Sequence, residues 1–123
     1  MSAEIQVIGV GSPLVDSLAC VDDAFIEANI PGAKGGMEVV TSEVMADLMG
    51  RLGEVPVEMA AGGSAGNTLY AMAKLGASCS MLGKLGKDSL GEYYRSTFSG
   101  VGVSGRSFKA TGDMDTGRCL VLI

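Results

Sequence analysis

The chain has 123 residues, of which 47% are hydrophobic, and a formal net charge of −5 at pH 7. This length fits a single domain, and the hydrophobic content argues against an intrinsically disordered chain. No cluster of Lys and Arg marks a face suited to duplex nucleic acid, so nucleic-acid binding is not expected.

The sequence gives no sign of a membrane segment, a secretory leader or a metal site. No apolar run approaches the roughly 18 residues that a membrane span needs, and residues 1–11 lack a basic leading region. Cys20, Cys79 and Cys119 are widely spaced, and the chain has no histidine that could complete a zinc site. We therefore expect a cytoplasmic protein without a metal site in this chain, whose cysteines are buried thiols in a reducing compartment.

The first part of the chain predicts strands around a helical turn, followed by a helix. Residues 4–11 are an apolar run that ends in glycines, as in a buried strand, and residues 14–21 alternate as a second strand. A short helical turn before Pro31 and a strand over residues 35–41 are expected next. Ser42 is the expected N-cap of a helix whose apolar positions form one stripe, namely Val44, Met45, Leu48, Met49 and Leu52.

The middle of the chain alternates strands and helices. Residues 55–60 and 77–83 are predicted strands. The helix between them ends at Gly76, and its expected inward positions are Leu69, Met72, Ala73 and Leu75. Ser89 and Glu92 have the spacing of a capping box, and the helix that they begin has one apolar face of Leu90, Tyr94 and Phe98. This order is typical of a parallel sheet with right-handed crossovers.

The last part of the chain breaks this alternation. Residues 106–123 predict two strands joined by a long hairpin loop, and with residues 14–21 and 35–41 they are candidates for a separate small sheet. The chain stops inside an apolar run, so we expect the protein to continue beyond Ile123, or this edge to pair with another chain.

Two glycine-containing segments fall short of known nucleotide-binding motifs. Gly9 and Gly11 follow a strand, but a dinucleotide fingerprint needs a third glycine where Leu14 stands, which weakens a dehydrogenase hypothesis. The stretch GKLGKDS differs from a P-loop because Met81 occupies the first glycine position and Asp88 replaces the Ser or Thr after the lysine.

The stretch GGSAGN, residues 62–67, has a more suitable context, between a strand and a helix. The paired glycines Gly62 and Gly63 let the backbone approach a bound molecule, and Asn67 offers both a donor and an acceptor. The carboxylate of Asp16 could accept hydrogen bonds from two neighbouring hydroxyls of a polyol. The alternative is that Gly62 and Gly63 only form a tight strand-to-helix turn and that Asp16 is a solvated charge in a loop.

Three segments carry a resemblance to a known family. Residues 62–94 resemble the first signature of the ribokinase-like, or PfkB, family of carbohydrate and nucleoside kinases, with its glycine pair, asparagine, alanine-rich helix and Gly-Lys-x-Gly-x-Asp-x-x-Gly. Residues 7–22 are similar to the opening strand and substrate aspartate of the family, and residues 116–123 to a later strand.

The resemblance implies an α/β fold, a ribokinase-like three-layer α/β/α arrangement, present in part, with a small β-sheet lid that often serves as a dimer surface. It also implies that Asp16, Gly62, Gly63 and Asn67 hold the hydroxyls of a sugar or nucleoside. The implied reaction is transfer of the γ-phosphoryl group of ATP to a hydroxymethyl oxygen, with Mg²⁺.

The chain departs from the family pattern in ways that bear on activity. The catalytic aspartate of the family lies in a later Gly-x-Gly-Asp, which this sequence lacks together with the nucleotide pocket. Residues 1–123 are therefore expected to be the N-terminal substrate-binding and lid portion, without a catalytic residue and inactive alone. Ser64 replaces the lysine of ribokinases proper, and Ser12 stands where nucleoside-type members often have asparagine, so the substrate stays open between a sugar and a nucleoside.

Two function hypotheses follow. The first is a PfkB-like phosphotransferase of which this chain is the substrate-binding portion, with ATP and Mg²⁺ used by the complete enzyme and a homodimer formed through the lid strands. The alternative is a non-catalytic sugar-binding or lid-mediated dimerisation module.

Overall fold

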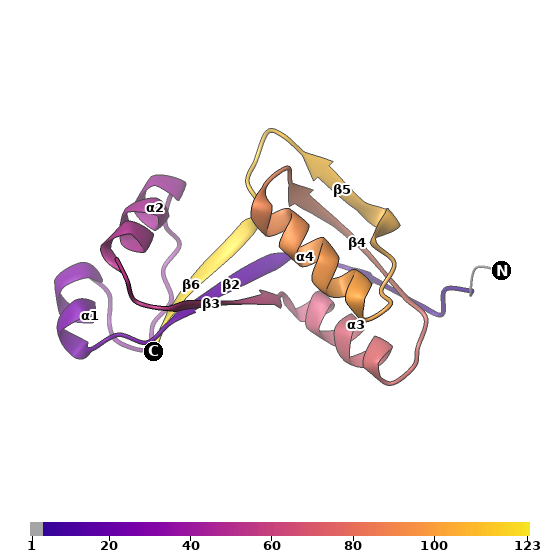
Figure 1. Ribbon diagram of the computed structural model, residues 1–123, viewed down its shortest axis with the longest axis horizontal. Coiled ribbons are helices and arrows are strands. Elements are labelled where there is room, and N and C mark those ends of the chain that lie inside the picture. The colour runs from indigo at the N-terminus through magenta and orange to yellow at the C-terminus, as the bar shows by residue number, and fades with distance from the viewer. Residues whose placement is uncertain (1–3) are drawn as a thin grey trace. The chain divides into compact units, whose positions relative to one another are not determined.

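The computed structural model describes residues 4–123 (Figure 1). Residues 1–3, the very start of the segment inspected for a leader, lie outside the described residues. The elements in chain order are β1 (Val7–Val10), β2 (Leu14–Ala19), α1 (Asp23–Asn29), α2 (Ser42–Arg51), β3 (Val57–Gly62), α3 (Ser64–Lys74), β4 (Cys79–Gly86), α4 (Ser89–Gly100), the 3-10 turn η1 (Gly105–Ser107), β5 (Phe108–Thr111) and β6 (Gly117–Leu122). No helix among residues 4–123 combines the length and hydropathy needed to cross a membrane.

One sheet has the strand order β1-β4-β5, and both pairs are parallel, as the alternation of strands and helices predicts. Helices α3 and α4 pack on one face of this sheet (Figure 1). The core between them is formed by Val15, Leu69, Cys79, Met81, Leu85, Tyr94, Phe98, Val103 and Phe108. On the other face Ile8 is 60% and Val10 74% exposed.

The second sheet has the strand order β3-β2-β6, so a separate small sheet is confirmed but its composition differs from the prediction. Residues 35–41 form no strand, because the chain there is irregular and Met37 and Val39 are almost fully exposed. Residues 106–123 form no hairpin. Strand β5 pairs with β4, and β6 joins the other sheet, so the polar loop between β5 and β6 connects two sheets.

Two predicted helix starts and one inward position are wrong. The N-cap of α2 is Thr41, whose hydroxyl accepts from the backbone N–H of Val44 at 3.3 Å. The N-cap of α4 is Asp88, whose side chain reaches the backbone of that helix where Ser89 was expected to do so. Leu75 is the C-cap of α3 and is 89% exposed, since the helix has ended before that residue can face the core.

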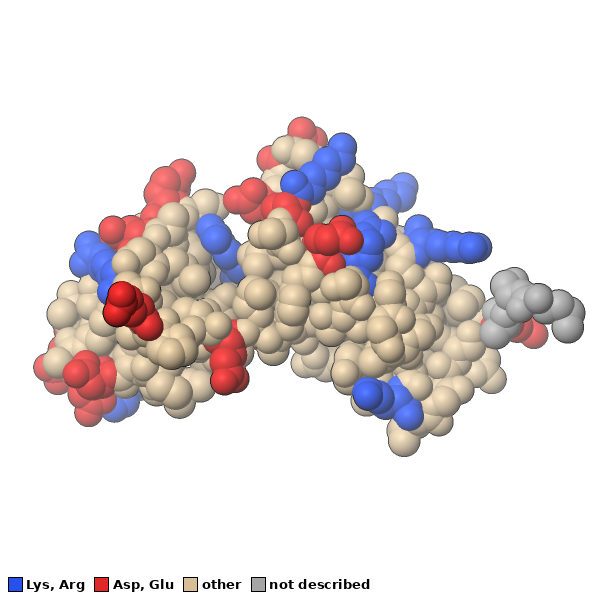
Figure 2. Space-filling view, in the orientation of Figure 1, with Lys and Arg blue, Asp and Glu red and all other residues tan. Residues whose placement is uncertain are grey.

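The chain divides into two compact units. The first runs to Asp16 and includes Met59–Cys119, and the second consists of Ser17–Glu58 and Leu120–Ile123. Figure 2 shows Lys and Arg side chains gathered around β5 in the first unit and mainly acidic side chains over α1 and α2 in the second.

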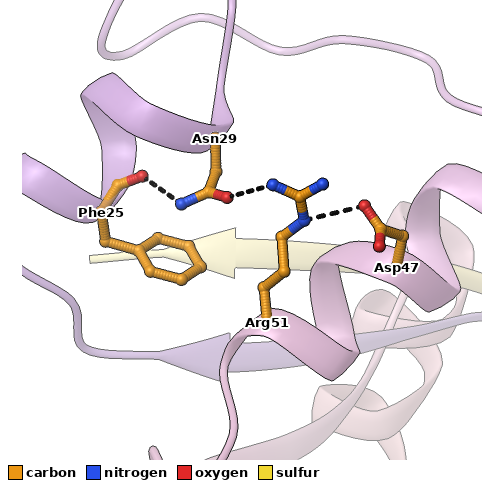
Figure 3. A network of polar contacts seen from close by, with 4 residues as sticks. All are labelled: Phe25, Asn29, Asp47 and Arg51. Atoms are coloured by element: carbon orange, nitrogen blue, oxygen red, sulfur yellow. Dashed lines mark hydrogen bonds and ion pairs between the residues drawn. The ribbon is translucent and has the colours of Figure 1, made fainter.

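A chain of polar contacts joins α1 to α2 within the second unit (Figure 3). The amide of Asn29 donates to the backbone carbonyl of Phe25 at 2.8 Å, and its oxygen accepts from Arg51 Nη1 at 2.9 Å. Arg51 Nε also donates to Asp47 at 2.8 Å, one helical turn earlier. The end of α1 is thereby attached to the last turn of α2.

Candidate functional site

The structure brings Asp16 and Gly62 into direct contact. Asp16 lies in the middle of β2, the central strand of its sheet, and Gly62 is the last residue of the neighbouring strand β3. A Cβ added to Gly62 would lie 2.5 Å from Oδ2 of Asp16, a distance that Cβ atoms essentially never show. Glycine at position 62 therefore leaves the space that the carboxylate occupies.

Gly63 makes the turn from β3 into α3. Its φ of +90° lies in a region that other residues rarely adopt, and a Cβ there would lie 2.7 Å from the carbonyl oxygen of Ser12. As N-cap of α3, Gly63 accepts from the backbone N–H of Asn67 at 2.8 Å but offers no side-chain cap. The first turn of α3 thus begins without a side chain covering its N–H groups.

Asn67 is exposed on the first turn of α3. Within residues 4–123 its side-chain amide has no hydrogen-bond partner, and neither has the carboxylate of Asp16. The four residues predicted to bind substrate therefore lie on β2 and across one strand-to-helix turn, all within the first unit. Their free donors and acceptors suit a ligand with several hydroxyls.

Tyr94 holds the backbone of this turn from the core side. It is fully buried on α4, its ring stacks on Phe98 with centroids 4.5 Å apart, and its hydroxyl donates to the carbonyl of Gly62 at 3.0 Å. Burial raises the pKa of Tyr94 to about 12, so the phenol stays protonated as a donor at neutral pH. A side chain at Gly66 would collide with the same hydroxyl, which explains that glycine as well.

Cys119 is a site neighbour that the sequence reasoning missed. It lies half-buried on β6, which flanks β2 on the side opposite β3. Burial and, next, the negative charge of Asp16 raise the pKa of the Cys119 thiol. The expectation of three buried thiols is wrong, because Cys20 is exposed and only Cys79 is fully buried. The sequence predicts that the strand with Cys119 pairs with residues 106–111 in a hairpin, so it does not place Cys119 next to the strand of Asp16.

Asp88 gives a structural reason for much of the Gly-Lys-x-Gly-x-Asp-x-x-Gly motif. Its carboxylate accepts from the N–H of Gly91 and from both the N–H and the hydroxyl of Thr116, all at 2.7 Å. Burial acts to raise the pKa of Asp88, but the hydrogen bonds from Thr116 and Gly91 outweigh it and lower the pKa overall. A Cβ at Gly91 would collide with the carbonyl of Gly86, so the motif packs the turn after β4 tightly.

A hollow of about 570 Å³ lies next to the candidate site, within the first unit. Ser12, whose carbonyl touches the turn at Gly63, is part of its wall, together with Lys84, Lys109, Met114 and Asp115. We call it the β4–β5 hollow. A second hollow, of about 400 Å³, lies in the other unit around Phe25 and Val55 and contains none of the predicted site residues.

Among residues 4–123 no group of three or more His, Cys, Asp or Glu side chains is placed to hold a metal ion.

Comparison with known proteins shows the family of this chain. Residues 39–123 match the family described as pfkB family carbohydrate kinase. The chain belongs to this family.

Solved structures agree with this assignment. The chain is 33% identical to an adenosine kinase from Sinorhizobium meliloti, with a TM-score of 0.79 over 98% of this chain and 36% of that one. It is 30% identical to a probable sugar kinase from Rhizobium etli CFN 42, with a TM-score of 0.78 over 97% of this chain and 35% of that one. An adenosine kinase from Schistosoma mansoni in complex with 2-fluoroadenosine shares the fold, at 23% identity and a TM-score of 0.81 over 99% of this chain and 37% of that one.

These matches confirm the α/β, ribokinase-like fold predicted from the sequence. The chain spans about a third of the length of the solved kinases that it matches.

Proposed function

We propose that this chain is the substrate-binding portion of a kinase that transfers the γ-phosphoryl group of ATP to a hydroxymethyl group of a sugar or nucleoside. The observation that carries the proposal is the contact between Asp16 and Gly62, which leaves an unpaired carboxylate beside a backbone without a side chain. Such a carboxylate accepts hydrogen bonds from two neighbouring hydroxyls.

The other predicted residues fit the same role. Gly63 keeps the chain close to Ser12, and Asn67 offers a donor and an acceptor for a further hydroxyl. The family is named for carbohydrate kinases, and its solved members at 30% identity or more include an adenosine kinase and a probable sugar kinase. A sugar ring with neighbouring hydroxyls, which free sugars and nucleosides share, is consistent with both.

ATP and Mg²⁺ belong to this proposal through the complete enzyme. A fructokinase from Xylella fastidiosa with the same fold has been solved with bound ATP. When bound, ATP supplies the phosphoryl group, while the residues of this chain hold and orient the accepting hydroxyl. We assign the catalytic base to an aspartate outside residues 1–123, so the chain alone should show no turnover in an ATP-coupled assay.

Titration of the chain with ribose, fructose and adenosine, followed by amide NMR, tests the proposal. We expect at least one ligand to shift the signals of Gly62, Gly63 and Asn67, and Asp16→Asn to weaken that binding about tenfold or more. In the complete enzyme, Asp16→Ala should raise KM strongly. The control is Asp47→Asn, which changes an exposed carboxylate in the other unit. It should change neither the ligand affinity of the chain nor the KM of the complete enzyme. Equal binding by the Asp16 variant would reject the proposed site.

The second candidate is a non-catalytic module that binds a sugar or dimerises through the strands of the β3-β2-β6 sheet. It is favoured only if the chain forms a discrete, concentration-dependent dimer in sedimentation velocity. A portion of a kinase should instead associate without a defined stoichiometry, because the open face of β1 exposes Ile8 and Val10.

A further inference from the structure

The open face of the first sheet has two lysines side by side. Lys84 on β4 and Lys109 on β5 are partners in the parallel register. Their strand neighbours Leu85 and Phe108 are buried in the core, so both lysines point to the opposite face, away from α3 and α4. Both are exposed and both line the β4–β5 hollow.

This pair has no ion-pair partner among the described residues. The ion pairs found within residues 4–123 join Lys34 to Asp23 and Arg51 to Asp47, and neither Lys84 nor Lys109 forms one. Asp115 also lines the hollow but lies beyond ion-pair distance of both. Like charges directly opposite on neighbouring strands are destabilising, so an anion between the two ammonium groups would be favourable.

The location is also suited to a ligand. Lys84 lies toward the carboxyl end of β4, with Lys109 of β5 directly beside it, and ligands of open parallel sheets bind at the carboxyl edge. The wall of the hollow includes several glycines with no side chain, among them Gly11, Gly86 and Gly117, and also Ser12, which touches the turn of the candidate site. The pair therefore stands beside the proposed hydroxyl-binding residues and is separate from them.

We propose that Lys84 and Lys109 form a binding site for phosphoryl oxyanions, of the kind that the phosphate chain of a nucleotide carries. The identity of the anion rests on the proposed phosphoryl transfer, whereas the anion site itself rests on the lysine pair and the hollow. Two ammonium groups in register neutralise two charges of such a chain and position its end near the accepting hydroxyl.

The experiment uses the full chain with ¹³C-dimethylated lysines, a modification that keeps the charge, and inorganic pyrophosphate as the probe at low ionic strength. The lysines are Lys34, Lys74, Lys84, Lys87 and Lys109. We expect the signals of Lys84 and Lys109 to shift together with one dissociation constant, on the order of 1 mM, while those of Lys34 and Lys74 stay in place. In Lys84→Gln the affinity reported by Lys109 should fall about three- to fivefold, and Lys74→Gln should leave it unchanged.

Shifts of equal size at all the lysines, without saturation, would overturn the inference, and so would binding that survives in the Lys84→Gln, Lys109→Gln double variant. The same sample, labelled with ¹⁵N as well so that the amide of Asn67 is observed, separates this inference from the proposed function. Pyrophosphate binding at the pair without any sugar or nucleoside response at Asn67 supports the anion site and rejects the proposed substrate site. A sugar or nucleoside that shifts the Asn67 signal, with no shift of the lysine signals by pyrophosphate, supports the proposed substrate site and rejects the anion site.

Discussion

The carboxylate of Asp16 and the α-carbon of Gly62 touch across neighbouring strands, so closely that a Cβ on Gly62 would lie 2.5 Å from Oδ2. This contact determines which residue position 62 can accept, because the side chain in the way is the one proposed to bind the ligand. The nearest other atom, the carbonyl oxygen of Leu14, is 3.5 Å away, so the carboxylate alone would have to move.

Gly62→Ala should therefore displace the Asp16 carboxylate. We expect ligand affinity to fall about tenfold, which corresponds to ~1.4 kcal/mol, and the free energy of unfolding to fall by about 1–3 kcal/mol. Isothermal titration and thermal unfolding measure the two effects. Gly100→Ala is the matched control in the same unit, because a Cβ there meets nothing within 4 Å and φ is not positive. Unchanged affinity in Gly62→Ala would separate Asp16 from the ligand.

Tyr94→Phe should destabilise the fold by about 1–2 kcal/mol, because the buried carbonyl of Gly62 would lose its donor from that ring. The pKa of Tyr94 is raised above the ordinary value of 10.0 to about 12, so the folded state favours the protonated phenol. The stabilisation is complete below pH 10 and is lost as the pH rises towards 12. Urea unfolding between pH 8 and 12 should show this decline in the wild type and not in Tyr94→Phe.

The control for Tyr94 is Tyr93→Phe. The Tyr93 hydroxyl donates to the carbonyl of Met59 at 2.8 Å, but this bond is exposed, so its loss should cost less than about 0.5 kcal/mol. Equal effects of the two substitutions would show that the Tyr94 hydrogen bond does not support the turn at Gly62.

Asp88→Ala should cost more than the loss of an ordinary helix cap. Asp88 caps α4 and also ties Thr116 to it, whereas Asp22 caps α1 through a single bond to Phe25 N at 2.8 Å. We expect about 1 kcal/mol for Asp22→Ala and about 2–3 kcal/mol for Asp88→Ala in chemical denaturation. Because the pKa of Asp88 is lowered, its stabilisation is present above pH 3.8 and is lost as the pH falls further. Similar costs for the two variants would reject the role of Asp88 in holding the loop before β6.

The sequence predicts most helices and strands better than it predicts which strands lie side by side. The apolar faces of α3 and α4 were readable because Leu69, Tyr94 and Phe98 recur at helical spacing and all three are buried. The glycine pair was readable because its only sensible context is a turn or a close approach. Both inferences depend only on residues that are close to one another along the chain.

The errors concern contacts between segments far apart in the chain. Nothing local distinguishes a hairpin from two strands that enter different sheets, so β5 and β6 were paired wrongly and the place of Cys119 beside β2 was missed. The strand expected over 35–41 failed for the same reason: its alternation of Met37 and Val39 with polar residues matters only if a sheet is there to bury them. The lysine pair likewise becomes visible only through the register of β4 and β5.

The last prediction concerns the polar chain of Figure 3 in the second unit. Asn29→Ala should lower the free energy of unfolding by about 1 kcal/mol, because it removes both the bond to the carbonyl of Phe25 and the bond from Arg51. Lys34→Ala, which removes an exposed ion pair to Asp23, should cost less than about 0.5 kcal/mol. A double-mutant cycle between Asn29 and Arg51 should give a coupling of at least about 0.5 kcal/mol. A coupling of zero, with equal losses for Asn29→Ala and Lys34→Ala, would mean that the network does not join α1 to α2 in solution.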